Sequence, residues 1–148
     1  MYNDIDDLIY GLSGAMMVFV IVLILGALLV RILFLLNLHK TLEAVSPENR
    51  TMEPGLVWLA LIPLFAWIWQ FFIVSKIGES LKVEFQSRDI AVKEDKPTYN
   101  TGLAWAILTV CAIIPFIGGL AGLAGFVFMI IYWVKTAEYK KQLLNHSF

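Results

Sequence analysis

Residues 97–134 read PTYNTGLAWAILTVCAIIPFIGGLAGLAGFVFMIIYWV and contain no Asp, Glu, Lys, Arg or His. A helix needs about 20 apolar residues to cross a hydrocarbon core of about 30 Å, so this stretch is nearly long enough for two crossings. Pro115, Gly118 and Gly119 lie near its centre, where they favour a turn. The sequence therefore predicts a helical hairpin with limbs over about 98–117 and 119–140.

Two more stretches without charge, residues 8–30 and 54–75, precede this one. Apolar residues continue beyond Arg31, so the first predicted helix runs over about 8–38 and the second over about 55–75. Together with the hairpin they give four hydrophobic helical segments. The fold class predicted from this pattern is all-α, a polytopic membrane protein with a single membrane domain over residues 1–148.

The composition agrees with a membrane protein and argues against other classes. Hydrophobic residues make up 59% and charged residues 16% of the chain, whereas soluble domains have about 45–50% apolar and about 25% charged residues. The net charge of −1 gives no basic field that would attract nucleic acid. Cys111 is the only cysteine, so the chain has no internal disulfide.

The second segment leaves two interpretations open. Trp67 and Trp69 would fall near the middle of a straight crossing helix, although tryptophans usually gather at membrane interfaces, and Pro63 adds a kink. The segment is either a kinked crossing, which its length favours, or a re-entrant or interfacial segment broken at Pro63. The spacing of Ile77, Leu81 and Phe85 then predicts an amphipathic helix over about 75–91.

Lysine and arginine set the expected orientation, because cytoplasmic connections carry an excess of them. Most lie in the second polar connection (Lys76, Lys82, Arg88, Lys93, Lys96) and in the tail (Lys135, Lys140, Lys141). Four crossings place both termini in the cytoplasm. A re-entrant second segment places the N-terminus outside and every basic residue inside. Both arrangements put the C-terminal tail in the cytoplasm.

The connection between the first two segments, residues 39–55, is polar. Ser46 before Pro47 is typical of a helix N-cap followed by the first helical residue. Four charged residues nearby form a candidate polar interaction surface: Glu43, Glu48, Arg50 and Glu53. The plainer interpretation, which we favour, is a capped turn whose charges are solvated.

Small and polar residues within the segments supply the remaining candidates. The candidate helix-packing residues are Gly11, Gly14, Gly118, Gly119, Gly122 and Gly125, since small residues let membrane helices approach closely. Gln70 and Thr109 are candidate intramembrane polar residues. No spacing of His, Cys or carboxylates predicts a metal site, and no nucleophile, phosphate-binding or dinucleotide motif occurs. We expect no cofactor.

Two blocks carry a resemblance to a known group. LEAVSPENRTMEPGLVWLALIPLF, residues 42–65, and IIYWVKTAEYKKQL, residues 130–143, resemble a group of small bacterial membrane proteins of unknown function, especially of the Bacteroidetes type. The resemblance implies a location in the bacterial inner (cytoplasmic) membrane and implies no activity.

Two functions fit these observations. The first is a non-enzymatic membrane protein that self-assembles or serves as an accessory or scaffold subunit, with the lipid bilayer and copies of itself or other membrane proteins as partners. The second is an oligomeric channel or conduit for a small solute, lined by Gln70 and Thr109. A channel needs polar groups along its path, and this chain offers few of them.

Overall fold

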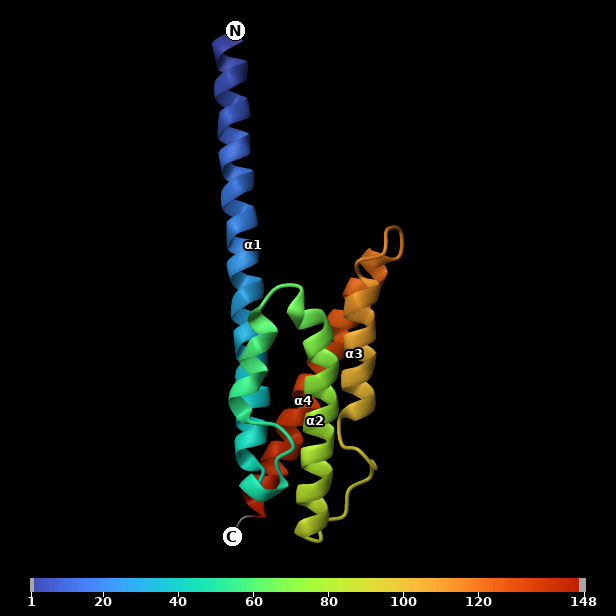
Figure 1. Ribbon diagram of the computed structural model, residues 1–148. Helices are drawn as coiled ribbons and strands as arrows, with labels where there is room; N and C mark the ends of the chain where they lie inside the picture. Colours follow the sequence, from blue (N-terminus) through green and yellow to red (C-terminus); the bar gives the residue numbers. More distant parts are fainter. Residues whose placement is uncertain (1, 147–148) are drawn as a thin grey trace. The chain divides into compact units, whose positions relative to one another are not determined.

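The computed structural model describes residues 2–146, with side chains from residue 10 onward. Its elements are α1 (Tyr2–Ala44), the short 3-10 helices η1 (Pro47–Asn49) and η2 (Pro54–Leu61), α2 (Phe65–Ser87), α3 (Tyr99–Cys111) and α4 (Gly118–Asn145) (Figure 1). The described residues contain helices and no strand, which confirms the all-α class. Two helical stretches, Tyr10–Ala44 and Gly118–Asn145, are long and apolar enough to cross a membrane.

Contacts divide the chain into two compact units, one up to Phe34 and one from Leu35 onward. In the first unit α1 is a single uninterrupted helix whose residues 10–29 are all exposed. Large apolar side chains such as Met16 and Phe19 are 69% and 64% exposed. An uncovered apolar helix of this length suits a lipid environment. The helix predicted over 8–38 is therefore present and continues to Ala44.

The second hydrophobic segment does not form the single helix expected over 55–75. It begins as η2, breaks at residues 62–64 and returns as α2, which lies beside η2 (Figure 1). Pro63 has no N–H to donate, and Leu64 adopts a positive φ of 64°, so neither continues a helix. The Trp69 indole N–H donates to the Leu56 carbonyl at 2.8 Å and fastens the two limbs together.

The predicted amphipathic helix is present as the continuation of α2, although it ends at Ser87 and not at residue 91. Ile77, Leu81 and Phe85 are fully buried, as their spacing predicts. The chain leaves the helix at Arg88, and Asp89 has a φ of 53°.

The predicted hairpin of residues 97–134 is also present, because α3 and α4 pack along each other and turn over residues 112–117 (Figure 1). Its first limb is shorter than the expected 98–117. α3 has 13 residues and ends at Cys111, four residues before Pro115, because a proline ring clashes with the carbonyl four residues earlier and has no N–H to donate to it. A Cβ added at Gly118 would collide with the Ala112 carbonyl oxygen, so this turn needs a glycine there.

Candidate functional site

The most concentrated polar site lies around Glu84, whose side chain is fully buried on α2. One carboxylate oxygen accepts hydrogen bonds from the Ser46 backbone N–H at 3.0 Å and the Asn49 amide at 2.7 Å. The other accepts from the Ser46 hydroxyl at 2.7 Å and from Arg88 Nε at 2.8 Å. We call Ser46, Asn49, Glu84 and Arg88 the Glu84 cluster.

Glu84 is held in its ionised form. Burial opposes the charge, but hydrogen bonds from Asn49, Ser46 and Arg88 outweigh it and keep the pKa of the Glu84 carboxyl below its usual value. Arg88 also donates to the Leu143 carbonyl at 2.9 Å, near the end of α4. The cluster therefore joins the loop at Ser46, the end of α2 and the end of α4, and its polar atoms are occupied by one another.

The sequence analysis did not predict this site, although the spacing of Glu84 from buried residues of the same helix points to it. Glu84 follows Leu81 by three residues and Ile77 by seven, which puts it on the buried face of the same helix. The prediction that Ser46 is an N-cap and Pro47 the first helical residue is confirmed in position. Ser46 precedes Pro47 at the start of η1, but its side chain makes no cap hydrogen bond and donates to Glu84 instead.

The candidate polar surface near this site is divided among different contacts. Arg50 donates through Nε to the Val45 carbonyl and through a terminal nitrogen to the Glu43 carbonyl, both at 2.9 Å, so it satisfies carbonyls at the end of α1. The Glu43 side chain lies 3.4 Å from His39. Glu48 and Glu53 are exposed. This arrangement matches a turn with solvated charges more closely than a recognition surface.

The two candidate intramembrane polar residues both make hydrogen bonds within the chain. Gln70 is buried and donates to the Ala106 carbonyl of α3 at 3.2 Å. Thr109 donates to the Trp105 carbonyl at 2.8 Å, one turn earlier in its own helix. Both side chains therefore form a hydrogen bond within the chain, and the conduit lined by Gln70 and Thr109 stays a hypothesis.

A second buried polar contact, around Asn37, was not predicted. The Asn37 amide donates to the Thr136 hydroxyl at 2.8 Å, and Lys140 donates to its carbonyl oxygen at 2.9 Å. Asn37 and Thr136 are both buried. This contact joins the last turns of α1 to α4 within the unit that starts at Leu35.

The candidate glycines fall into two groups. A Cβ at Gly125 would lie 3.3 Å from Leu108, and one at Gly122 would lie 3.8 Å from Ala112, so these glycines, like Gly118, serve the contact of α4 with α3. Gly11, Gly14 and Gly119 have nothing within 4 Å of such a Cβ. One crowded position was not predicted: a Cβ at Gly102 would lie 2.8 Å from Tyr132 and from Val74.

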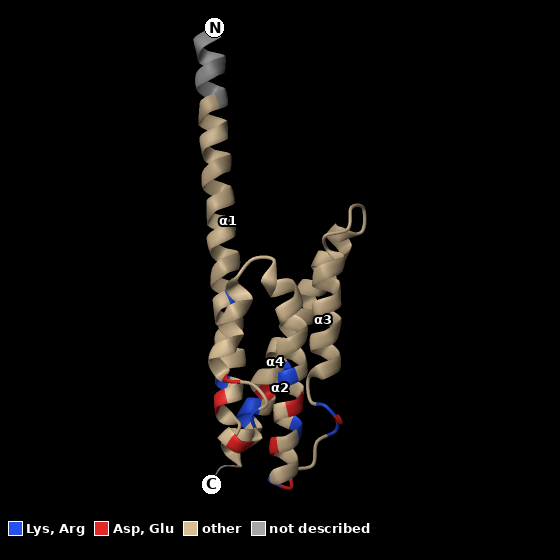
Figure 2. Cartoon of the chain, viewed as in Figure 1, with Lys and Arg blue, Asp and Glu red and all other residues tan. Residues whose placement is uncertain are grey.

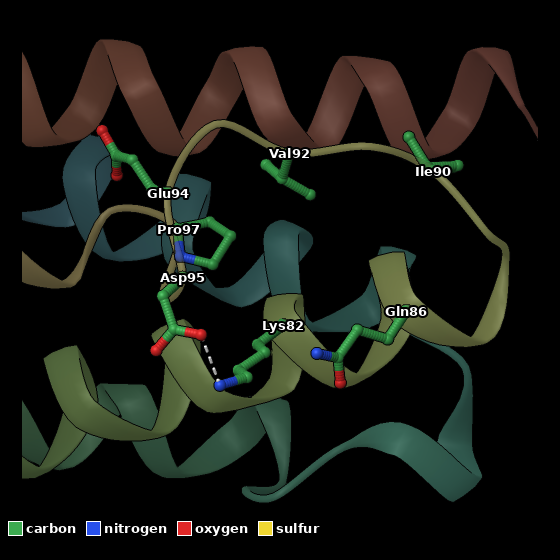
Figure 3. Close-up of a pocket in the computed structure, with 7 residues that line it drawn as sticks. All are labelled: Lys82, Gln86, Ile90, Val92, Glu94, Asp95 and Pro97. Carbon is green, nitrogen blue, oxygen red and sulfur yellow. Dashed lines mark hydrogen bonds and ion pairs between the residues drawn. The ribbon is translucent and has the colours of Figure 1, made fainter.

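The loop after α2 covers a small cavity of about 200 Å³ (Figure 3). Lys82 and Gln86 of α2 lie on one side, facing the loop that carries Ile90, Val92, Asp95 and Pro97. Lys82 pairs with Asp95 at 2.7 Å, and Lys135 of α4 pairs with Glu94 at 2.6 Å. Cavities that bind small molecules usually measure about 300–1,000 Å³. We interpret this cavity as the space under the loop after α2, which two ion pairs hold in place.

Among the described residues, no three or more His, Cys, Asp or Glu side chains gather where they could hold a metal ion. Comparisons of the chain with protein-family models, with curated proteins and with solved structures give no match. The resemblance to small Bacteroidetes membrane proteins therefore stays a prediction, and the function has to be argued from the structure.

Proposed function

We propose that the protein is a non-enzymatic integral membrane protein that acts as a self-assembling or accessory subunit of a membrane complex in the bacterial inner membrane. The observation that carries this proposal is the uncovered apolar stretch of α1, residues 10–29. Within it, Gly11 and Gly14 pack against nothing in the chain. Small residues on an exposed membrane helix let a second helix approach closely, and such packing drives helix association in lipid.

The polar side of the molecule supports the same proposal. The Glu84 cluster and the Asn37 contact use their hydrogen-bonding atoms on each other, and Gln70 and Thr109 bond to backbone carbonyls. A catalytic centre needs a nucleophile or base with room for a substrate beside it. These buried polar groups instead hold elements together.

For the arrangement across the membrane, we propose a single crossing by α1, a re-entrant second segment and a cytoplasmic C-terminal tail. Support comes from the reversal at residues 62–64, since the four-crossing alternative needs this segment to continue in one direction. With the reversal, all the basic residues of the connections and the tail lie on one side, as the positive-inside rule favours.

Mass measurement of the full chain tests the assembly role. In mild detergent and in lipid nanodiscs we expect a mass above that of one chain, or a stoichiometric co-purifying membrane protein. Gly11→Leu with Gly14→Leu should reduce assembly by obstructing close approach. Gly119→Leu, at a glycine equally free of neighbours, is the matched control and should leave it unchanged. A strict monomer with no co-purifying protein in both media would refute the proposal.

A further inference from the structure

Two turns of the unit that starts at Leu35 are made of apolar residues, and the charged residues of that unit gather at its other end (Figure 2). One turn is residues 62–64 and the other is residues 112–117. At each turn a bulky residue adopts a positive φ, 64° at Leu64 and 72° at Phe116. These side chains are 72% and 105% exposed. A positive φ costs steric energy in residues with a Cβ, and two of the four non-glycine residues that have one in the described chain, Leu64 and Phe116, lie at these exposed apolar tips.

Around the turn at residues 62–64 the backbone donors of residues 62 and 65–67 are paired within the chain, whereas the Leu64 N–H is not. Ile62 donates to Leu59, and Pro63 has no N–H. Immediately beyond Leu64, Phe65 donates to Pro63, Ala66 to Ile62 and Trp67 to Leu64. Hydrocarbon contains no water to satisfy backbone groups, so each donor that is paired internally lowers the free-energy cost of placing the turn there, and the unpaired Leu64 N–H adds to that cost.

At the turn of residues 112–117 most backbone donors are paired within the chain, whereas the N–H groups of Phe116 and Ile117 donate to no backbone carbonyl. Ala112 donates to Leu108, Ile113 to Val110 and Ile114 to Cys111. Gly118 then donates to Ile114, and Pro115 again has no N–H. Ile113, Ile114 and Ile117 beside Phe116 are about half exposed, so the side-chain surface of this turn is apolar.

The lengths of the limbs decide how deep these turns reach. α3 has 13 residues, which span about 20 Å at 1.5 Å per residue. The uncharged part of α2, residues 65–75, spans about 16 Å, and that of α4, residues 118–134, about 25 Å. Each of these charge-free lengths is shorter than the hydrocarbon core of about 30 Å, and tilt shortens its reach further. α4 as a whole is long enough to cross, but from Lys135 onward it carries several charged residues.

We propose that residues 35 onward enter the bilayer from its cytoplasmic face only, and that both turns end inside the hydrocarbon with Leu64 and Phe116 against acyl chains. This inference rests on the membrane setting of the proposed function and is independent of the assembly role. It makes the α3–α4 hairpin a second re-entrant element beside the second segment.

Depth measurement on the full chain tests this placement. Single cysteines are introduced in a Cys111→Ala background at Phe116, Leu123 and Ile131, all at least 40% exposed, and are labelled with a nitroxide. The protein is reconstituted in vesicles of phosphatidylethanolamine and phosphatidylglycerol. Collision of each nitroxide with oxygen, which concentrates in hydrocarbon, is compared with its collision with a water-soluble nickel chelate.

We expect depth to decrease in the order 116, 123, 131, and a label at Leu64 to be deeper than one at Phe72. A hairpin that crosses twice reverses the first order, with 123 deepest and 116 open to the nickel chelate, and this result would overturn the proposal. If both reagents are excluded at residue 116 and this exclusion disappears on dilution with lipid, a second copy of the chain covers the turn. That result too would overturn the proposal.

One further label, and a comparison of the depth order with the number of copies, keep the test decisive. If the variant at residue 116 does not fold, Leu120, which is 76% exposed in the first turn of α4, reports on the same turn and should be deeper than 123. The order of depths does not depend on the number of copies. A correct order in a monomeric protein would therefore refute the assembly role alone, whereas a reversed order in an oligomer would refute only the re-entrant placement.

Discussion

Replacing Glu84 by Gln tests whether the Glu84 cluster holds the charged end of the fold together. The substitution keeps the shape of the side chain but removes its charge, and it replaces one acceptor oxygen by an NH2 group. Ser46, Asn49 and Arg88 all donate to the carboxylate, so the new NH2 group faces donors in place of an acceptor. At least one of these hydrogen bonds is lost, and Arg88 loses its charged partner.

The magnitude follows from burial. Removing one partner of a buried ion pair costs about 3–5 kcal/mol, because the remaining charge stays uncompensated. The Arg88 side chain is 24% exposed, so water compensates it in part, and we expect about 3 kcal/mol, at the lower end of that range. The matched control is Glu79→Gln on the same helix. Glu79 is 33% exposed and pairs with Lys76 at 3.0 Å, and surface pairs are worth about 0–1 kcal/mol.

The assay is SDS-induced unfolding of the full chain in mixed micelles, followed by tryptophan fluorescence. The free energy of unfolding of the Glu84→Gln variant should fall by about 3 kcal/mol, and that of the Glu79→Gln variant by less than about 1 kcal/mol. Equal losses for the two variants would show that the buried carboxylate contributes no more than a surface pair, and the argument from burial would be wrong.

Three further outcomes are expected. Because hydrogen bonds depress the pKa of Glu84 in the fold, the contribution of its carboxylate to the free energy of unfolding is complete above the unfolded pKa of about 4.3 and is lost as the pH falls below that value. Unfolding titrations at descending pH should therefore show a smaller loss of unfolding free energy in the Glu84→Gln variant than in the unchanged protein. Gly102→Ala should destabilise the fold by about 1–3 kcal/mol through overpacking, whereas Gly119→Ala, where nothing lies within 4 Å, should not; equal melting temperatures would contradict this. Asn37→Ala should cost about 1–3 kcal/mol by leaving Thr136 and its neighbours short of partners, measurable by the same unfolding, and an unchanged midpoint would contradict it.

The helices could be predicted from the sequence because long runs without charge determine where the chain can be apolar and helical. The turn of the last hairpin was marked by Pro115 and two glycines, and it lies where expected. The reversal in the second segment was harder, since Leu64 carries the positive φ and no glycine signals it. Pro63 and the mid-segment tryptophans indicated a break but not its geometry.

The candidate site could be predicted less well, because polar contacts between distant segments leave no local pattern. Glu84 reads as one of several charges interspersed on an amphipathic helix, and only its spacing from Ile77 places it on the buried face. Its partner Ser46 lies 38 residues earlier. The glycines show the same limit: Gly118 and Gly125 pack as expected, but Gly102, which is also crowded, belongs to no small-residue motif.

The Glu84 cluster has a consequence for biosynthesis. Ser46 and Asn49 precede Glu84 and leave the ribosome before it, whereas the Leu143 carbonyl that Arg88 binds follows Arg88 by 55 residues. During synthesis the loop at Ser46 can bond to the Glu84 carboxylate as soon as α2 emerges. These hydrogen bonds can therefore stabilise the reversal of the second segment while α4 is still being translated. The hydrogen bond from Arg88 to the Leu143 carbonyl can form only afterwards, when the end of α4 packs against elements that are already in place.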